Sequence, residues 1–281
     1  MIVLTLLVYK LITLSLERDF GAIKGGLVGV EEEKLERWSA KKYDKFTKGW
    51  SQDYLAEIEE RTSKMSFLSP LTMLVFCLYM TFFAFDQIMS VDAHWYSTLF
   101  GALYFMSGAY ISMAWCGIVY MLCRKCYPLI KAKVKKNTLH DLGKLLFGFG
   151  IFWAYMFWSH YLPLWYANVP EHTGWMITRL REDPWHCFAW LVLGLCFIIP
   201  FLLGLSRDIK KVPILHSLIS VIVAIGVWMM IYILIVPTLY PHSIPLGITD
   251  IAIALGFMGA YLLSVMSFLD KYPLIPFGDM Y

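Results

Sequence analysis

Residues 139–171 combine a long apolar and aromatic run with several side chains that can exchange protons or form hydrogen bonds. These are His140, Asp141 and Lys144 at the beginning of the run, and Ser159 and His160 near its end. Ionisable groups inside hydrocarbon cost at least a few kcal/mol each, and they are usually retained for function. The stretch is therefore more typical of a proton or quinol site than of a plain membrane anchor.

The candidate residues fall into two groups. In the first, Asp141 and Lys144 are three positions apart, so they share a helix face and can pair, and His140 lies beside them. The second group comes from three hairpin ends that short loops can bring together: Asp86, Asp92, His94, Ser159, His160, Tyr166, Glu171 and Asp250. We expect Asp86, Asp141, Lys144 and His160 to carry proton transfer, because a buried histidine near a carboxylate can pass protons near neutral pH. The other residues are expected to support them.

Structural roles compete with this interpretation at several positions. Asp92 and Asp250 can be helix N-caps, since aspartate is a preferred capping residue. Tyrosines and tryptophans gather at membrane interfaces simply as anchors. His216, near the start of its own apolar segment, can also be an interface residue. Capping explains Asp86, Asp141 and His160 least well.

The composition places the chain among membrane proteins. Of 281 residues, 59% are hydrophobic and only 16% are charged, which is unlike a soluble globular domain. The net charge of +3 is small, and the basic residues are concentrated in a few loops. This distribution favours a role in membrane topology and argues against binding to nucleic acid.

The apolar segments predict an all-α integral membrane bundle of about seven transmembrane helices, since about 20 apolar residues cross a bilayer. One short segment covers residues 1–16, and fuller segments follow at 67–90, 95–122, 142–166, 185–205, 213–237 and 248–268. We therefore divide the chain into a short first transmembrane helix at 1–16, a cytoplasmic loop at 17–65, and a six-helix bundle at 66–281.

Two of these regions allow a second interpretation. The segment 1–16 can be a signal peptide, but Lys10 interrupts its apolar run and no small-residue cleavage site is clear, which favours a spanning helix. Within 17–65, apolar residues recur at helical spacing from Leu35 to Ile58. This pattern indicates either an amphipathic helix on the membrane surface or a solvated connector.

Basic residues alternate between loops and so predict the orientation of the chain. The basic loops are 17–65, 124–138 and 206–212, whereas 91–94, 167–184 and 238–247 contain only Arg179 and Arg181. Because basic loops stay in the cytoplasm, the N-terminus is expected outside and the C-terminus inside. In a bacterial inner membrane the N-terminus would then be periplasmic.

The sequence lacks the signatures of a bound redox centre. No pair of histidines has the spacing of a bis-imidazole haem site, and there is no CxxCH motif and no iron–sulfur run of cysteines. A single CxxC, Cys123 to Cys126, is a weak metal or redox signal without a second pair. We therefore expect no metal and no cofactor on this chain, and any redox centres on partner subunits.

Two stretches resemble a known family. Phe85 to Gly101 reads FDQIMSVDAHWYSTLFG, and Leu139 to Glu171 reads LHDLGKLLFGFGIFWAYMFWSHYLPLWYANVPE. Both are similar to motifs of the ActF-type membrane subunit of alternative complex III, a bacterial quinol:cytochrome c oxidoreductase. That subunit belongs with the NrfD-like membrane proteins of the polysulfide-reductase type. The tail DKYPLIPFGD is also similar, so the resemblance covers roughly residues 66–281.

The resemblance implies a respiratory role. The partners it implies are a homologous ActC-type membrane subunit, multihaem cytochrome c subunits, an iron–sulfur subunit and lipids. Haem c and iron–sulfur clusters on those partners would take electrons from menaquinol or another quinol, while this subunit contributes a proton path. The motif matches carry over as candidates for that path: Asp86, Asp92, His94, His140, Asp141, Lys144, Ser159, Tyr166, Asn168 and Glu171.

Two departures from the family matter. Family members usually have about ten helices, so an N-terminal part of the expected double bundle is missing here. His160 stands where the family commonly has glutamine, which places a titratable group in the middle of the path. Two other functions stay open: a structural membrane anchor for peripheral redox subunits, and a secondary transporter, which helices broken at mid-membrane would favour.

Overall fold

The computed structural model describes residues 1–26, 44–127 and 136–272, except for the side chains of residues 171 and 172. Within these ranges the elements are all helical, and no β-strand occurs. Six helices are long and apolar enough to cross a membrane. The expected all-α membrane bundle is confirmed at this level, and its six full segments match these helices. The segment at the N-terminus is not among the six, so the count of seven stays a prediction.

The chain divides into two compact units, which are described separately. The first unit is built from the two ends of the chain. It contains α1 (Ile2–Lys24), most of α4 (Tyr54–Phe83) and nearly all of α13 (Ile248–Lys271). The second unit covers residues 79–248 and begins within the last turns of α4.

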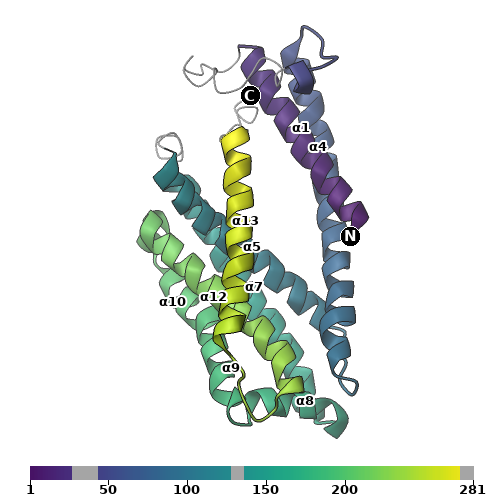
Figure 1. The fold of residues 1–281 in the computed structure, drawn as a ribbon, viewed down its shortest axis with the longest axis vertical. Helices are drawn as coiled ribbons and strands as arrows, with labels where there is room; N and C mark the ends of the chain where they lie inside the picture. The colour runs from purple at the N-terminus through teal and green to yellow at the C-terminus, as the bar shows by residue number, and fades with distance from the viewer. Residues whose placement is uncertain (27–43, 128–135, 273–281) are drawn as a thin grey trace. The chain divides into compact units, whose positions relative to one another are not determined.

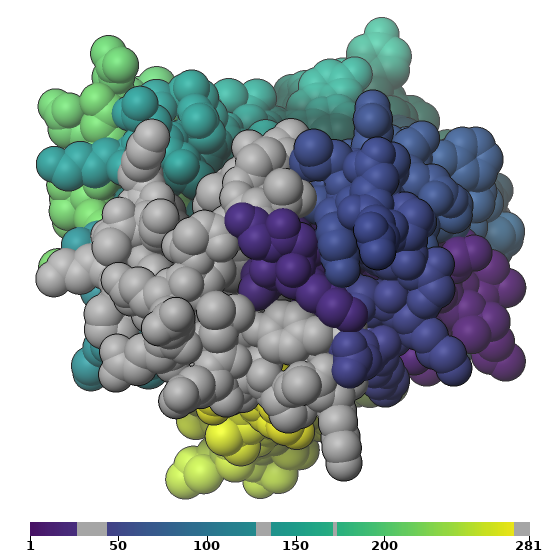
Figure 2. Space-filling model, turned by 90° about the horizontal axis from the view of Figure 1, so that it is seen from above, coloured from purple at the N-terminus to yellow at the C-terminus, as the bar shows by residue number. Residues whose placement is uncertain are grey.

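In the first unit, α1 and α4 lie side by side (Figure 1), and an ion pair joins them. The Nε of Arg61 on α4 lies 3.0 Å from a carboxylate oxygen of Glu17 on α1. Phe20 and Ile58 are buried in the small apolar core between the two helices. In the space-filling view, the end of α1 lies directly against the segment that follows residue 44 (Figure 2).

These contacts correct the boundaries expected for the loop at 17–65. Helix α1 continues to Lys24 and α4 begins at Tyr54, so both ends of that range are helical. The physical reason is that the charged residues there pair across the two helices, and the pairing allows polar turns to extend the apolar segments. The amphipathic helix expected within the range falls partly on residues 27–43, which are outside the described residues.

The second unit is a bundle of long helices with short elements at its ends (Figure 1). Its long segments are α5 (Phe100–Cys126), α7 (Lys136–Ala167), α12 (Pro213–Leu239), and one span made of α9 (Trp185–Leu193), the π-helix η3 (Gly194–Ile198) and α10 (Ile199–Leu205). The short elements are the π-helix η1 (Ala84–Ile88), the 3₁₀ turn η2 (Met89–Val91), α8 (Pro170–Leu180) and α11 (Arg207–Lys211). Helix α5 packs on both α7 and α12.

Glycines allow the helices of this bundle to approach closely. Helix association in a membrane depends on close packing, because lipid is as apolar as the side chains that would be buried. A Cβ added at Gly226 on α12 would lie 2.9 Å from the backbone nitrogen of Cys196 in η3. By contrast, Gly148 on α7 has open space around it. Gly226 therefore sets the distance between α12 and η3.

Replacing Gly226 with alanine is expected to lower the stability of the bundle by about 1–3 kcal/mol, because the added methyl group meets backbone that cannot rotate away. The matched change Gly148→Ala should leave stability unchanged or raise it by up to about 1 kcal/mol through helix propensity. Thermal unfolding in detergent measures both. Equal melting temperatures for the two variants would contradict this account of the packing.

Candidate functional site

The second unit encloses an apolar pocket with two polar groups in its wall. Five helices line it, α5, α7, α8, α9 and α12, and its empty volume is about 590 Å³, counting the part open to the surroundings. The polar members are His160 on α7 and Arg179 on α8, and both are buried, each 4% exposed. Trp153 and Trp175 contribute aromatic wall. We call this the His160 pocket.

The two ring nitrogens of His160 differ in their hydrogen bonding. Its Nδ1 lies 3.1 Å from the hydroxyl oxygen of Ser97. Its Nε2 is buried and has no hydrogen-bond partner among the residues that the structure describes. The hydrogen bond at one ring nitrogen sets the tautomer and therefore whether the other donates or accepts. If Nδ1 carries the hydrogen and donates it to the hydroxyl of Ser97, Nε2 is unprotonated and can accept a hydrogen bond or a proton.

Two stacked tryptophan rings lie beside His160. The rings of Trp95 and Trp175 lie parallel, with centroids 3.8 Å apart. The imidazole of His160 meets Trp95 edge-on, at 5.8 Å between centroids. On Trp175 the guanidinium of Arg179 lies 3.8 Å from a ring centroid, which is a close cation–π contact. These contacts with the stacked rings restrict the orientation of the His160 and Arg179 side chains.

Arg179 is held by the backbone of α12. Its Nε donates to the carbonyl of Ile233 at 2.9 Å, and a terminal nitrogen donates to the carbonyl of Leu234 at 2.9 Å and to the hydroxyl of Thr238 at 2.7 Å. The carbonyl of Ile233 is the one that would accept from residue 237 in a regular helix. Pro237 has no N–H to donate. Arg179 therefore replaces the donor that proline removes.

The charge of Arg179 is retained in this setting. Burial lowers the pKa of Arg179, while the carboxylate of Asp92 acts in the opposite direction. An arginine keeps its proton at neutral pH even when its pKa is lowered, so the guanidinium is a fixed positive charge beside the pocket. Its remaining terminal nitrogen donates to the carbonyl of Trp175 at 2.9 Å.

A short loop between η2 and α5 delivers two of these residues, Trp95 and Ser97. The carboxylate of Asp92 accepts from the backbone N–H of His94 at 3.1 Å, which closes a local turn. The backbone N–H of Ser97 in turn points to the sulfur of Met89 at 3.4 Å. Asp92 and His94 thus shape the loop that carries Trp95 and Ser97 to His160.

The structure does not pair His160 with Asp86, contrary to expectation. Asp86 lies on the π-helix η1 and is exposed, because Ala84 and Ile88 are the positions of that turn that face inward. Among the described residues, Ser97 is the hydrogen-bond partner of His160, and no carboxylate contacts it. Two other residues between Asp86 and Gly101 contact His160: Ser97 by a hydrogen bond and Trp95 by a ring contact.

The other predicted group is brought together as expected but lies on the surface. The ammonium of Lys144 donates to the carboxylate of Asp141 at 2.8 Å, and the Nδ1 of His140 lies 4.0 Å from the same oxygen. The side chains of Asp141 and Lys144 are both more than half exposed. Asp141 precedes His160 by 19 positions on α7, so about 28 Å of helix separates the two groups.

The supporting candidates are scattered. Ser159 is half-buried outside the pocket lining, and Tyr166 is 83% exposed near the end of α7. Asn168 has a left-handed backbone, with φ at 47°, and ends α7 in the manner of a C-cap. Glu171 lies in α8 with its side chain outside the described part of the chain. Asp250 is in the first turn of α13 and belongs to the first unit.

One cluster of metal-ligand residue types went unnoticed in the sequence. Asp183, His186 and Cys187 have donor atoms that all lie within 4.8 Å of one another. Their spacing of three and four positions places them on one face where α9 begins, and this is the signal that could have found them. All three are exposed or half-buried, and the Nε2 of His186 already accepts from Trp190 at 3.0 Å. The cluster is separate from the His160 pocket lining.

The fold and the pocket together define a multi-pass α-helical membrane protein with a histidine and an arginine in an internal aromatic pocket. No protein-family model matches the chain, and no curated protein is significantly similar to it in sequence. The resemblance to ActF-type subunits therefore stands on the quoted motifs alone.

Proposed function

We propose that this chain is a membrane subunit of a respiratory quinol:cytochrome c oxidoreductase and that its His160 pocket receives a quinol headgroup and its protons. The observation that carries the proposal is the buried Nε2 of His160, which has no hydrogen-bond partner in the described part of the chain and belongs to a pocket lined by aromatic rings. Ligand sites are typically apolar concavities with a few convergent polar groups. The motif resemblance supplies the respiratory setting.

The chemistry of a quinol matches this wall. Its flat ring fits against aromatic side chains of the lining such as Trp153 and Phe157, and its hydroxyl hydrogens need acceptors. Oxidation removes two electrons and two protons. Nε2 of His160 takes the two protons one after the other, and Nδ1 releases the first one toward Ser97 before the second hydroxyl O–H bond breaks. The fixed charge of Arg179 stabilises the quinolate oxygen that the proton leaves behind. The electrons pass to a redox centre on a partner subunit.

The proton accepted by His160 leaves through the loop that holds it. Ser97 touches Nδ1 and is half-buried, so it links the histidine to the end of the unit where Asp92 and His94 lie. The Asp141–Lys144 pair at the other end of α7 would serve uptake from the opposite side of the membrane. About 28 Å separates it from His160, so water must complete a path between them.

Replacing Asp141 with asparagine tests this second step. We expect proton uptake by the assembled complex in vesicles to slow by about tenfold or more, while electron transfer in detergent is retained, because Asp141 lies far from the pocket. Replacing Asp208 with asparagine, at an exposed carboxylate on α11, is the matched control. Unchanged uptake in the Asp141→Asn complex would remove Asp141 from the path.

The setting of the proposal is a bacterial inner membrane. The partners would be a homologous NrfD-like subunit, multihaem cytochrome c subunits and an iron–sulfur subunit, with menaquinol or another quinol as substrate. Basic residues at the end of α5, at the start of α7 and in α11 support a C-terminus in the cytoplasm, as the positive-inside rule requires, and α1 as a seventh span would place the N-terminus in the periplasm.

Co-purification from detergent-solubilised membranes tests the proposed function. The expected result is a complex that stains for haem and contains cytochrome and iron–sulfur subunits by mass spectrometry. Tryptophan fluorescence of that complex should fall on addition of a soluble quinone, because two indoles line the pocket. A complex with haem partners but no quinone-dependent quenching would indicate a structural anchor. A chain that purifies alone and haem-free would overturn the respiratory assignment.

A further inference from the structure

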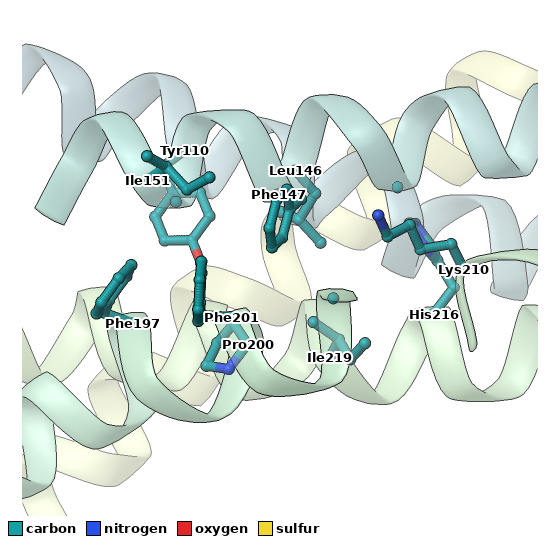
Figure 3. A pocket seen from close by; sticks show the side chains of 13 residues that line it. Tyr110, Leu146, Phe147, Ile151, Phe197, Pro200, Phe201, Lys210, His216 and Ile219 are labelled. Carbon is teal, nitrogen blue, oxygen red and sulfur yellow. The ribbon is translucent and has the colours of Figure 1, made fainter. Parts of the chain in front are cut away.

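A second pocket in the same unit is cationic at one end and apolar at the other. It is lined by α5, α7, η3, α10 and α12, with α11 at its edge, and its empty volume is about 370 Å³, counting the part open to the surroundings. Figure 3 shows Lys210 and His216 at one end and Tyr110 and Phe197 at the other, with Phe147 and other apolar side chains between them. We call this the Lys210 pocket.

Lys210 places a positive charge at one end of this pocket. Its ammonium lies 4.6 Å from the ring centroid of Phe147, and no carboxylate pairs with it among the described residues. Its stem packs against α7 at Gly143, where an added Cβ would lie 2.9 Å from the Cβ of Lys210. Burial and the nearby Lys144 lower the pKa of Lys210. Glycine at 143 thus lets a lysine lie along an apolar groove with its charge uncompensated.

The groups around Lys210 add to this positive charge. Lys144 is paired with Asp141, and His140 lies near both. Arg207 and Lys211 are on the same short helix as Lys210, and Asp208 there is exposed and forms no ion pair among the described residues. Like charges at the mouth of an apolar pocket repel one another, and an anion would relieve that repulsion.

We propose that the Lys210 pocket binds an anionic phospholipid, with its phosphate at Lys210 and the first part of an acyl chain along Phe147 toward Phe197. Basic pockets between transmembrane helices are a known way of recognising anionic headgroups. A free phosphate would use only the cationic end, whereas a lipid also fills the apolar length of the pocket. The proposal does not depend on the quinol site, because the two pockets have no lining residue in common.

Native mass spectrometry of the full-length protein, titrated in detergent with phosphatidylglycerol or phosphatidylcholine, tests this site. We expect phosphatidylglycerol to bind more tightly, and Lys210→Gln to weaken its binding about fivefold, which is the value of one lysine near an anionic surface. Lys210→Arg should retain binding. The control Lys211→Gln removes the neighbouring charge, which does not line the pocket, and should change binding by less than about twofold.

Two further measurements distinguish a bound lipid from a bound soluble anion. Ile151→Trp leaves Lys210 in place but fills the apolar part of the pocket, and it should also weaken phosphatidylglycerol. Inorganic phosphate should not displace the lipid. Displacement by inorganic phosphate would assign the site to a soluble anion and overturn the lipid proposal. Equal losses in Lys210→Gln and Lys211→Gln, or no preference for phosphatidylglycerol, would overturn it as well.

Discussion

Replacing His160 with leucine is expected to slow quinol oxidation by the assembled complex about 100-fold or more, because it removes the one proton acceptor among the described residues that line the pocket. Leucine fills a similar volume and leaves the aromatic stack of Trp95 and Trp175 in place. Electron transfer from a soluble quinol to cytochrome c measures the effect in the purified complex. Phe152→Leu, on the exposed face of α7, is the matched control and should keep full activity.

The variant His160→Gln separates proton transfer from hydrogen bonding. Glutamine can bond to Ser97 and to a quinol oxygen, but it cannot take a proton at neutral pH. If His160 is the proton acceptor, His160→Gln should bind quinone with near-normal affinity and yet oxidise quinol slowly. A fully active His160→Gln complex would show that the group at position 160 only orients its ligand, as the glutamine common in the resembled family would.

Hydropathy predicted the boundaries of the last three spans to within three residues, whereas α5 begins five residues after its expected start and α7 begins six residues before its own. The span expected at 185–205 is occupied by α9, η3 and α10 over the same residues, and the one at 213–237 extends only to Leu239. The first unit was harder to predict. The polar ends of α1 and α4 are helical because Arg61 and Glu17 pair across them, and such a long-range pair leaves no local signal.

For the site as well, the sequence indicated one key residue but not its contacts. His160 stands out in the sequence as an ionisable residue in an apolar run, and its burial agrees with that expectation. The sequence placed Asp86 in the same group as His160, but contact between them depends on which face of η1 turns inward. Arg179 was passed over because it lies in a polar segment between spans. Its burial follows from Pro237, some 58 residues later, and only the folded bundle brings these two residues together.

Replacing Arg179 with methionine should destabilise the second unit by about 2–4 kcal/mol, which is the expected cost of leaving a buried carbonyl without a donor and losing charged hydrogen bonds. Methionine keeps the unbranched apolar stem of the side chain and ends near the position of Nε, so the loss reports on the guanidinium, including its contact with Trp175. Unfolding in detergent measures it. Arg181→Met removes the exposed arginine that follows α8, and it should cost less than about 0.5 kcal/mol.

A double-mutant cycle with Pro237→Ala tests the reason for that cost. Alanine restores the N–H that can bond to the carbonyl of Ile233, so Arg179 is no longer its sole donor. In the Pro237→Ala background we therefore expect Arg179→Met to cost less, by about 1–2 kcal/mol. If the cost is the same in both backgrounds, the repair of Pro237 is not what holds Arg179 in place. The stack on Trp175 and the charge beside the His160 pocket would then account for its burial, and the functional role of Arg179 would gain weight over the structural one.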